Sequence, residues 1–121
     1  MHCTMLCGDT ALYDGEATMV VARSVNGEFA IMEGHAPLLA ALDRGLLRIK
    51  TAEREQAFAV RSGAMNVGER GDVTVLVSEA HRADEIDGLD LARRIQQAEA
   101  ESEEEEAAWF RWLQGLEGSR G

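Results

Sequence analysis

His35 is the residue of this chain best suited to proton transfer, and it stands two positions before Pro37, the only proline. Because an imidazole titrates near neutral pH, His35 could serve as a general base. The sequence brings no second catalytic group to it: His81 is 46 residues away, and no Gly-x-Ser-x-Gly elbow, phosphate-binding loop or His-Glu-x-x-His motif is present. We favour a histidine that orders a turn through a backbone hydrogen bond. No catalytic residue is expected, and the chain by itself is interpreted as a non-enzymatic interaction module.

Cys3 and Cys7 are the only cysteines, and with Met5 they alternate along an apparent strand, so that all three side chains point to one face. With His2 nearby they could form a metal or redox pair, but two cysteines do not complete a zinc site. We favour three soft residues in an apolar core. The glutamate run at 103–106 lacks the spaced Asp or Asn and the central Gly of a calcium loop. It is interpreted as a solvated helix face, and no metal is expected.

The net charge of the chain is −10, and it is unevenly distributed. Residues 1–83 carry 8 Lys and Arg against 11 Asp and Glu, whereas residues 84–121 carry 4 against 11. An acidic half repels phosphates, and no basic stripe exists to release counterions, so nucleic acid is not expected as a partner. No apolar run approaches the roughly 20 residues that cross a bilayer, and the first residues lack the features of a signal peptide. We therefore expect a cytoplasmic protein without direct membrane insertion.

Short β-prone segments at nearly regular spacing predict that residues 1–83 form an antiparallel sandwich or barrel. Asn26-Gly27 predicts a type I′ hairpin turn, since both central positions of such a turn need positive φ. Asp14-Gly15 is another hairpin signal, Glu33-Gly34 marks a second bend, and Pro37 belongs at a strand start or edge because it cannot donate a ladder hydrogen bond. Strands are expected near residues 2–7, 16–23, 38–42, 46–50, 57–61, 64–67 and 73–78, with one more inside 27–39.

Residues 84–121 predict a separate, acidic helical domain. No Gly or Pro occurs between Leu89 and Gly115, and the residues there are mainly strong helix formers. Asp87 or Asp90 could cap the start of the helix. The region could be one long helix or a two-helix hairpin bent near Ser102, and the sequence leaves both open.

An apolar stripe follows the second half of this region, at helical spacing i, i+3, i+4 and i+7. It could anchor a partner, since buried aromatic residues dominate interface energetics, or it could dock the tail onto the sandwich. The residues of the stripe are Trp109, Trp112, Leu113 and Leu116.

The segment Gly27-Glu28-x-x-Ile31, followed by Gly34-His35-Ala36-Pro37-Leu38-Leu39, resembles the epsilon subunit of F-type ATP synthases. Further landmarks recur in the family's order and approximate spacing between about residues 10 and 87. They are Asp14-Gly15-Glu16, Gly45-Leu46-Leu47-Arg48-Ile49, Ser62-Gly63, Val73-Thr74-Val75-Leu76 and Ala80-x-x-Ala83-Asp84-Glu85-Ile86-Asp87. Three positions depart from the usual pattern: Ala30, Glu33 and Ala64.

The resemblance implies a flattened sandwich of about ten strands followed by a C-terminal helical hairpin. It implies a non-catalytic rotor subunit that links the gamma subunit to the polar loops of the c-ring and couples proton translocation to ATP synthesis. Glu28, with Asn26 and Gly27, would face the c-ring, and His35 would lie near the contact with ring or stalk. The protein would be peripheral, on the cytoplasmic face of an energy-transducing membrane.

The resemblance also implies two properties of the tail. Leu89-Asp90-Leu91-Ala92-Arg93-Arg94 is similar to the family's ATP-binding signature except at its last position, so Asp90, Arg93 and Arg94 could bind ATP as a regulatory ligand. An ordinary helix N-terminus is the alternative we favour, and no other cofactor is expected. The tail would also contact the catalytic alpha and beta subunits, but its acidic run opposes the usual inhibitory insertion. We expect weak inhibition, or inhibition through the aromatic stripe. The alternative to the rotor function is a free-standing nucleotide-sensing β-sandwich.

Overall fold

The computed structural model describes residues 1–86 and 88–119, which divide into two compact units, Met1–His81 and Arg82–Gly121. The first unit, here called the β-domain, contains ten strands, the last of which ends one residue beyond it. They are β1 (His2–Cys7), β2 (Thr10–Glu16), β3 (Met19–Ser24), β4 (Gly27–Met32), β5 (Leu38–Leu42), β6 (Gly45–Lys50), β7 (Glu55–Val60), β8 (Gly63–Val67), β9 (Val73–Val77) and β10 (Ala80–Arg82).

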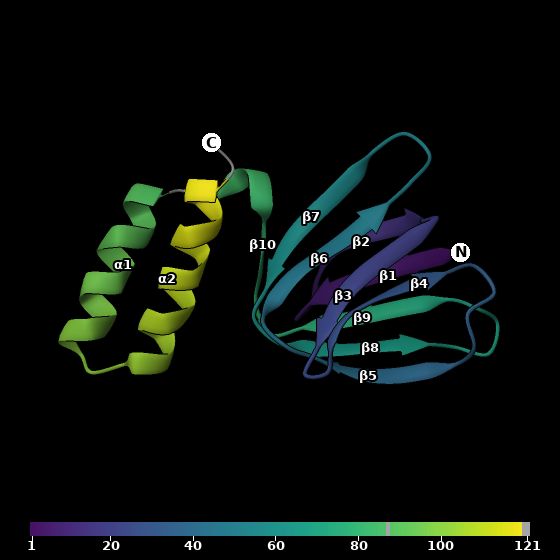
Figure 1. Ribbon diagram of the computed structural model, residues 1–121, viewed down its shortest axis with the longest axis horizontal. Coiled ribbons are helices and arrows are strands. Elements are labelled where there is room, and N and C mark those ends of the chain that lie inside the picture. Colours follow the sequence, from purple (N-terminus) through teal and green to yellow (C-terminus); the bar gives the residue numbers. More distant parts are fainter. Residues whose placement is uncertain (87, 120–121) are drawn as a thin grey trace. The chain divides into compact units, whose positions relative to one another are not determined.

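The strands form one continuous sheet that curls over into two layers (Figure 1). Its order is β10-β7-β6-β3-β5-β8-β9-β1-β2, with β4 added beside β3. Strands β3 and β5 meet at a single pair, Ser24 with Leu42, and this is where one layer passes into the other. The predicted ten-strand sandwich is therefore confirmed. Strands β1 and β9 are parallel, whereas the pairs β1-β2, β3-β4, β3-β5, β3-β6, β5-β8, β6-β7 and β8-β9 are antiparallel.

Alternate residues of each strand point into the space between the two layers and form the core. The largest fully buried side chains include Phe58, Ile31 and Leu47 from one layer and Met5 and Met65 from the other. Cys3 and Met5 are both completely buried, which confirms their interpretation as core residues, whereas Cys7 is half-buried. Burial also raises the pKa of the Cys3 thiol to about 11, so Cys3 is a neutral thiol at neutral pH.

Two strands lie where the residues did not predict them. Strand β2 runs straight through Asp14-Gly15, so the hairpin predicted at that dipeptide is wrong. Pairing with β1, which extends from His2 opposite Glu16 to Cys7 opposite Thr10, outweighs the local preference for a turn. Strand β10 has three residues, too few to show an alternating pattern.

The second unit, here called the helical unit, is a helical hairpin. A short 3₁₀ helix at Ala83–Glu85 is followed by α1 (Gly88–Ala100) and α2 (Glu104–Ser119), which pack against each other. The chain turns at Ser102, whose φ of 59° lies in the left-handed region. Asp90 lies in the first turn of α1, while Asp87, the other predicted cap, is outside the described residues.

The break between the helices follows from hydrogen bonding as well as charge. The Glu103 N–H donates to the Ala98 carbonyl (2.8 Å) and closes α1, while the Glu103 carbonyl accepts from the Ala107 N–H (2.9 Å) and opens α2. Glu104, Glu105 and Glu106 then occupy the first turn of α2, where carboxylates are favoured by the helix dipole. Neither described helix is long and apolar enough to cross a membrane.

Candidate partner-binding surfaces

The turn at Asn26 and Gly27 is not the predicted type I′ turn. Gly27 has a φ of 116°, whereas Ser102 is the only described non-glycine residue with positive φ, so Asn26 does not adopt that conformation. The Ser24 hydroxyl holds the turn by accepting from the Asn26 N–H (3.1 Å) and donating to the Gly27 carbonyl (3.2 Å). One positive-φ glycine therefore suffices to reverse the chain here.

Glu28 lies just after this turn, on β4, and the structure gives it an intrachain partner. Arg48 on β6 reaches across β3 so that its Nη2 lies 3.1 Å from Glu28 Oε1. Arg48 Nε lies 3.7 Å from Glu55 Oε1, too far for a hydrogen bond, and it has no hydrogen-bond partner among the described residues. The Glu28 side chain is still 55% exposed, so an incoming cation can reach it. Arg48 was not predicted as part of this site, because its proximity comes from pairing between distant strands.

His35 lies at the opposite end of β4 from the Asn26-Gly27 turn. Strand β4 has six residues, so its ends are about 17–20 Å apart. His35 Nδ1 lies 2.6 Å from the Ala36 carbonyl, and because a carbonyl can only accept, Nδ1 carries the donated proton. His35 therefore orders its own turn, as the favoured interpretation expected. The structure separates the predicted contact residues into two groups, one at each end of β4.

The outer face of the layer β5-β8-β9-β1-β2 carries a row of apolar side chains that sequence reasoning did not find. The strand register aligns them across five strands, and their inward-pointing neighbours Met65, Val75 and Met5 are completely buried. We call these residues the apolar row: Ala41, Ala64, Leu76, Leu6 and Ala11. Leu76 is 51% exposed, and Leu39, one position over on β5, is 76% exposed.

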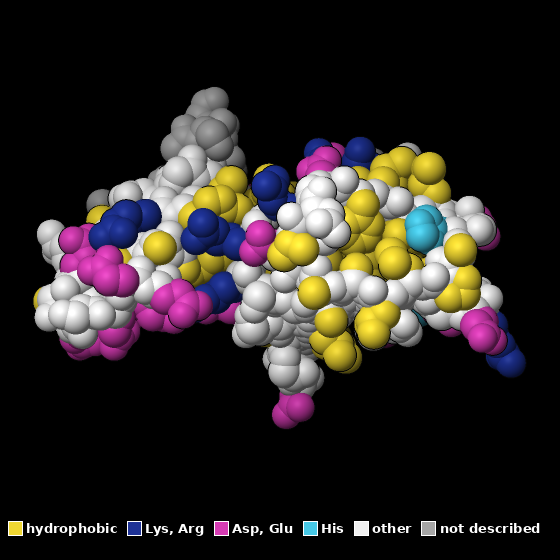
Figure 2. Space-filling view, turned by 60° about the horizontal axis from the view of Figure 1, so that its bottom comes forward, with side chains coloured by type: hydrophobic (Ala, Val, Ile, Leu, Met, Phe, Trp, Pro, Cys, Tyr) yellow, Lys and Arg dark blue, Asp and Glu magenta, His cyan; other side chains and the backbone are white. Residues whose placement is uncertain are grey.

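A second row runs beside the apolar row and starts from Leu39 on β5. Its middle consists of short hydrogen-bonding side chains, Asn66, Thr74 and Thr4, and it ends at Asp14 on β2. Figure 2 shows hydrophobic side chains gathered over the β-domain on the side in view, whereas Asp and Glu side chains gather over the helical unit. The middle of this second row thus places short hydrogen-bonding side chains beside the exposed apolar ones, a mixture that is usual in surfaces that receive another protein.

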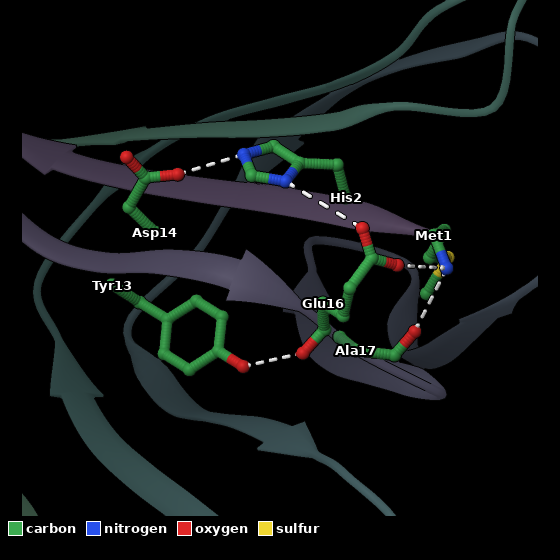
Figure 3. A network of polar contacts seen from close by, with 6 residues as sticks. All are labelled: Met1, His2, Tyr13, Asp14, Glu16 and Ala17. Atoms are coloured by element: carbon green, nitrogen blue, oxygen red, sulfur yellow. Dashed lines mark hydrogen bonds and ion pairs between the residues drawn. The ribbon is translucent and has the colours of Figure 1, made fainter.

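The edge of this face at β1 and β2 is fixed by a polar network (Figure 3). His2 Nε2 lies 2.7 Å from Asp14 Oδ1, and His2 Nδ1 lies 3.8 Å from Glu16 Oε1. The Met1 ammonium pairs with Glu16 Oε2 (3.3 Å), and the Tyr13 hydroxyl donates to the Glu16 carbonyl (2.6 Å). The contacts of Met1 and His2 tie the edge strand β2 to the start of β1, while the Tyr13 hydrogen bond lies within β2. Both ring nitrogens of His2 thus lie beside carboxylates, of Asp14 and Glu16. Within the described residues, no group of three or more His, Cys, Asp and Glu side chains could hold a metal ion.

In the helical unit, the residues expected to contact a nucleotide lie close together. Asp90 Oδ1 accepts from Arg93 Nη2 (2.5 Å), and Asp90 Oδ2 lies 2.8 Å from Arg94 Nε. Arg94 also places its guanidinium carbon 5.7 Å from the centroid of the Phe110 ring, which links α1 to α2. Both arginines are therefore already engaged by Asp90, and a phosphate would have to compete with that carboxylate.

The predicted aromatic stripe is divided between the inside and the surface of the helical unit. Trp109 and Leu113 are each 1% exposed, so they are not available to a partner while α1 and α2 are packed. Trp112 stacks on Trp109 with 5.4 Å between ring centroids, and Trp112 and Leu116 are half-buried. The half-buried pair is the part of the stripe that another protein can reach.

Comparison with known proteins adds information that the geometry does not contain. A family model for the β-sandwich domain of the ATP synthase delta/epsilon chain matches residues 1–83. The ATP synthase epsilon chain of Streptomyces avermitilis is 34% identical over 103 residues, which covers 85% of this chain and 83% of that protein. The epsilon chain of Synechococcus elongatus is 43% identical over 89 residues, which covers 74% of this chain and 64% of that protein.

Two solved structures share the fold. A chain of the Euglena gracilis mitochondrial ATP synthase, determined as OSCP/F1/c-ring in rotational state 1, superimposes with a TM-score of 0.69 at 24% identity. That match covers 81% of this chain and 62% of that chain. A chain of the Tetrahymena thermophila mitochondrial ATP synthase, from a structure of the central stalk and c-ring, gives a TM-score of 0.65 at 14% identity and covers 93% and 95%.

Proposed function

Because this chain belongs to the ATP synthase delta/epsilon family, we propose that it is a non-catalytic subunit of the central stalk of an F-type ATP synthase. In this function it links the gamma subunit to the c-ring and passes rotation between them, so that ion flow through the ring is coupled to ATP synthesis. As a stalk subunit, the protein would be peripheral to the membrane, on the side where the stalk lies. The relatives with the same fold come from stalk and c-ring assemblies, which supports this proposal.

The apolar row is the observation that carries the proposal for the gamma subunit. A row of apolar side chains across five strands, with Leu76 51% exposed and Leu39 of the neighbouring row 76% exposed, is costly to leave in water. Covering it with a flat protein surface removes that cost, and the neighbouring Asn66, Thr74 and Thr4 supply hydrogen bonds around the apolar centre. We assign this face to the gamma subunit.

The test is co-elution of the chain with the gamma subunit of the same organism on a sizing column. The wild-type protein is expected to form a tight one-to-one complex. The double variant Leu39→Asp/Leu76→Asp should weaken the complex by about tenfold or more, because two carboxylates would be desolvated at an apolar interface. The control is Met32→Asp: Met32 is 54% exposed but lies on β4, in the other layer of the sheet. Separate peaks for the wild-type protein would reject the function and move attention to nucleotide titration.

Glu28 and the Asn26-Gly27 turn are the proposed contact with the c-ring. A basic side chain on a ring loop would share the Glu28 carboxylate with Arg48, and an exposed pair of this kind is worth about 0–1 kcal/mol. Glu28→Ala should therefore weaken ring binding modestly, and more at low salt than at high salt. Intact holoenzyme assembly and ATP synthesis in the Glu28→Ala variant, at elevated salt as well, would remove Glu28 from the contact.

We propose that the C-terminal tail inhibits ATP hydrolysis only weakly. The tail carries a run of four acidic residues, Glu103 to Glu106, whose charge opposes its insertion beside an acidic surface of the catalytic head. Removing residues 89–121 should therefore barely raise ATP hydrolysis by that head. A several-fold rise would contradict this. ATP is the proposed regulatory ligand of Asp90, Arg93 and Arg94, and calorimetric titration of Arg93→Ala against the wild-type chain tests that assignment.

A further inference from the structure

Arg48 lies on the outer face of the layer β4-β3-β6-β7, between two carboxylates that belong to different strands. Its neighbours along β6, Leu47 and Ile49, are each 1% exposed and point into the core, so the Arg48 side chain points outward. Its Nη2 lies 3.1 Å from Glu28 Oε1 on β4, and its Nε lies 3.7 Å from Glu55 Oε1 on β7. Within the described part of the chain, no other cation lies within ion-pair distance of either carboxylate.

The strand register places these two carboxylates on opposite sides of Arg48. Directly across from Arg48 are Val21 on β3 and Ala57 on β7, whose short apolar side chains offer it no polar partner. Glu28 belongs to the neighbouring row of cross-strand residues on one side, and Glu55 belongs to the neighbouring row on the other side. A long side chain reaches such diagonal positions, so the guanidinium can approach either carboxylate by leaning one way or the other along the face.

In the position observed, the hydrogen bonding of Arg48 is incomplete. Its Nε is buried and has no hydrogen-bond partner among the described residues. A buried N–H without an acceptor is costly, and the distance to Glu55 is too long for a hydrogen bond. A shift of about 0.5 Å toward Glu55 would bring Nε within hydrogen-bond distance, but it would lengthen the bond to Glu28. Arg48 is therefore held by Glu28 with a second acceptor just out of reach.

We propose that Arg48 is a positioning residue that passes from Glu28 to Glu55 when a cation of a partner subunit binds Glu28. Once that cation neutralises the Glu28 carboxylate, Arg48 gains more from Glu55, because its Nε then acquires the acceptor that it lacks. Every charge keeps a partner before and after the exchange. The identity of the partner as the c-ring rests on the function proposed above, whereas the exchange of Arg48 between two carboxylates of this chain does not.

The exchange gives Arg48 and Glu55 opposite effects on the contact at Glu28. Arg48 competes with the incoming cation, so Arg48→Gln should strengthen the contact. Glu55 accepts the displaced Arg48, so Glu55→Gln should weaken the contact, although Glu55 lies on β7 and Glu28 on β4. In the double variant the loss of Glu55 should have no further effect, because Arg48 is absent. If the ion pairs only stabilised the layer, both single variants would weaken the contact.

The first experiment tests the exchange in the free chain. In the ¹⁵N-labelled protein, the Arg48 Nε–H signal is identified by its absence from Arg48→Gln. In Glu28→Gln, this signal should shift downfield and exchange more slowly with water, as Arg48 moves to Glu55. In Glu28→Gln/Glu55→Gln it should do neither. The control is Glu69→Gln, which removes an exposed carboxylate from the turn between β8 and β9 and should leave the signal unchanged. An unchanged signal in Glu28→Gln, or the same shift in the double variant, overturns the proposal.

The second experiment tests the exchange at the contact itself. Binding of the chain, in complex with gamma, to detergent-solubilised c-ring is compared between the wild-type protein and the two single variants. Arg48→Gln should bind about two- to fivefold more tightly and Glu55→Gln about two- to fivefold more weakly, with both differences shrinking at high salt. Weaker or unchanged binding of Arg48→Gln overturns the exchange at this contact. Failure of the wild-type complex to bind the ring contradicts the proposed function instead, and the Arg48 Nε–H signal then decides the exchange by itself.

Discussion

The β-domain and the helical unit of this chain are stabilised in different ways. The β-domain closes two layers over a core to which nearly every strand contributes, and its charges balance to within a few units. The helical unit buries a much smaller set of side chains: Ile86, Leu91, Ile95, Ala98, Ala107, Trp109 and Leu113. Residues 84–121 also carry 11 acidic against 4 basic residues.

This difference separates the tasks that the two units can perform. A sheet with a large core presents its outer face and its turns as rigid surfaces, which suits a permanent contact with other subunits. A helical hairpin of about forty residues is near the lower limit of what folds by packing alone, so it opens at lower free energy. The proposed binding surfaces lie on the first unit, and the proposed regulation lies in the second.

The strongest test of the comparison is Gly63→Ala, at the start of β8. A Cβ at this position would lie 2.2 Å from the Leu76 carbonyl oxygen and 3.0 Å from the Val77 Cα, both backbone atoms of β9. The strands would have to separate, so we expect destabilisation of more than about 4 kcal/mol and poor recovery of soluble protein. Urea unfolding followed by circular dichroism measures the effect.

The matched control is Gly115→Ala in α2. No atom lies within 4 Å of a Cβ at this position, and alanine is the better helix former, so stability should rise by about 0.5–1 kcal/mol. If both substitutions changed the free energy of unfolding equally, close backbone packing would not be what distinguishes the β-domain from the helical unit.

Trp109→Ala should have the next largest effect, and it should be confined to the helical unit. Trp109 is the largest fully buried side chain of the chain, and removing such a residue costs about 3–5 kcal/mol. That loss exceeds what a small helical unit can spare, so amide exchange protection within 88–119 should collapse while that of β8 and β9 persists. Because Trp112 is only half-buried, Trp112→Ala should destabilise the helical unit less than Trp109→Ala does. Parallel loss of protection in β8 and β9 would show that the two units unfold as one.

The smallest expected effect is a dependence of the helical unit on pH. The pKa of Glu103 is raised, first by a hydrogen bond with the Glu101 side chain and then by the Glu101 charge. A group whose pKa is higher in the folded state binds protons more tightly there, so its contribution is complete below the ordinary pKa and is lost as pH rises through the raised value. Exchange protection of α2 should therefore increase slightly from pH 7 towards pH 4. Glu101→Ala should remove this increase, and an increase that survives it would assign the effect to other carboxylates.

Much of the fold follows from local patterns in the sequence. Alternation and turn residues predicted β1 at residues 2–7 and β5 at residues 38–42, both with the bounds observed. The Glu33-Gly34 bend and Pro37 directly before β5 are also as predicted, because a positive φ and a missing N–H are properties of single residues. The change to strong helix formers after residue 88 likewise predicted a separate helical unit, because helix propensity is a property of single residues.

The remaining features depend on contacts between distant residues. The parallel pairing of β1 with β9, the passage of β2 through Asp14-Gly15, and the register that aligns the apolar row are set by long-range strand pairing, which outweighs local preference. The choice of a hairpin over one helix was likewise open until Ser102 and Glu103 were seen to close α1 and open α2. The sequence by itself determined which elements exist, since propensity is local. The tertiary structure decided which surfaces they form, because each of those surfaces combines residues that only the fold brings together.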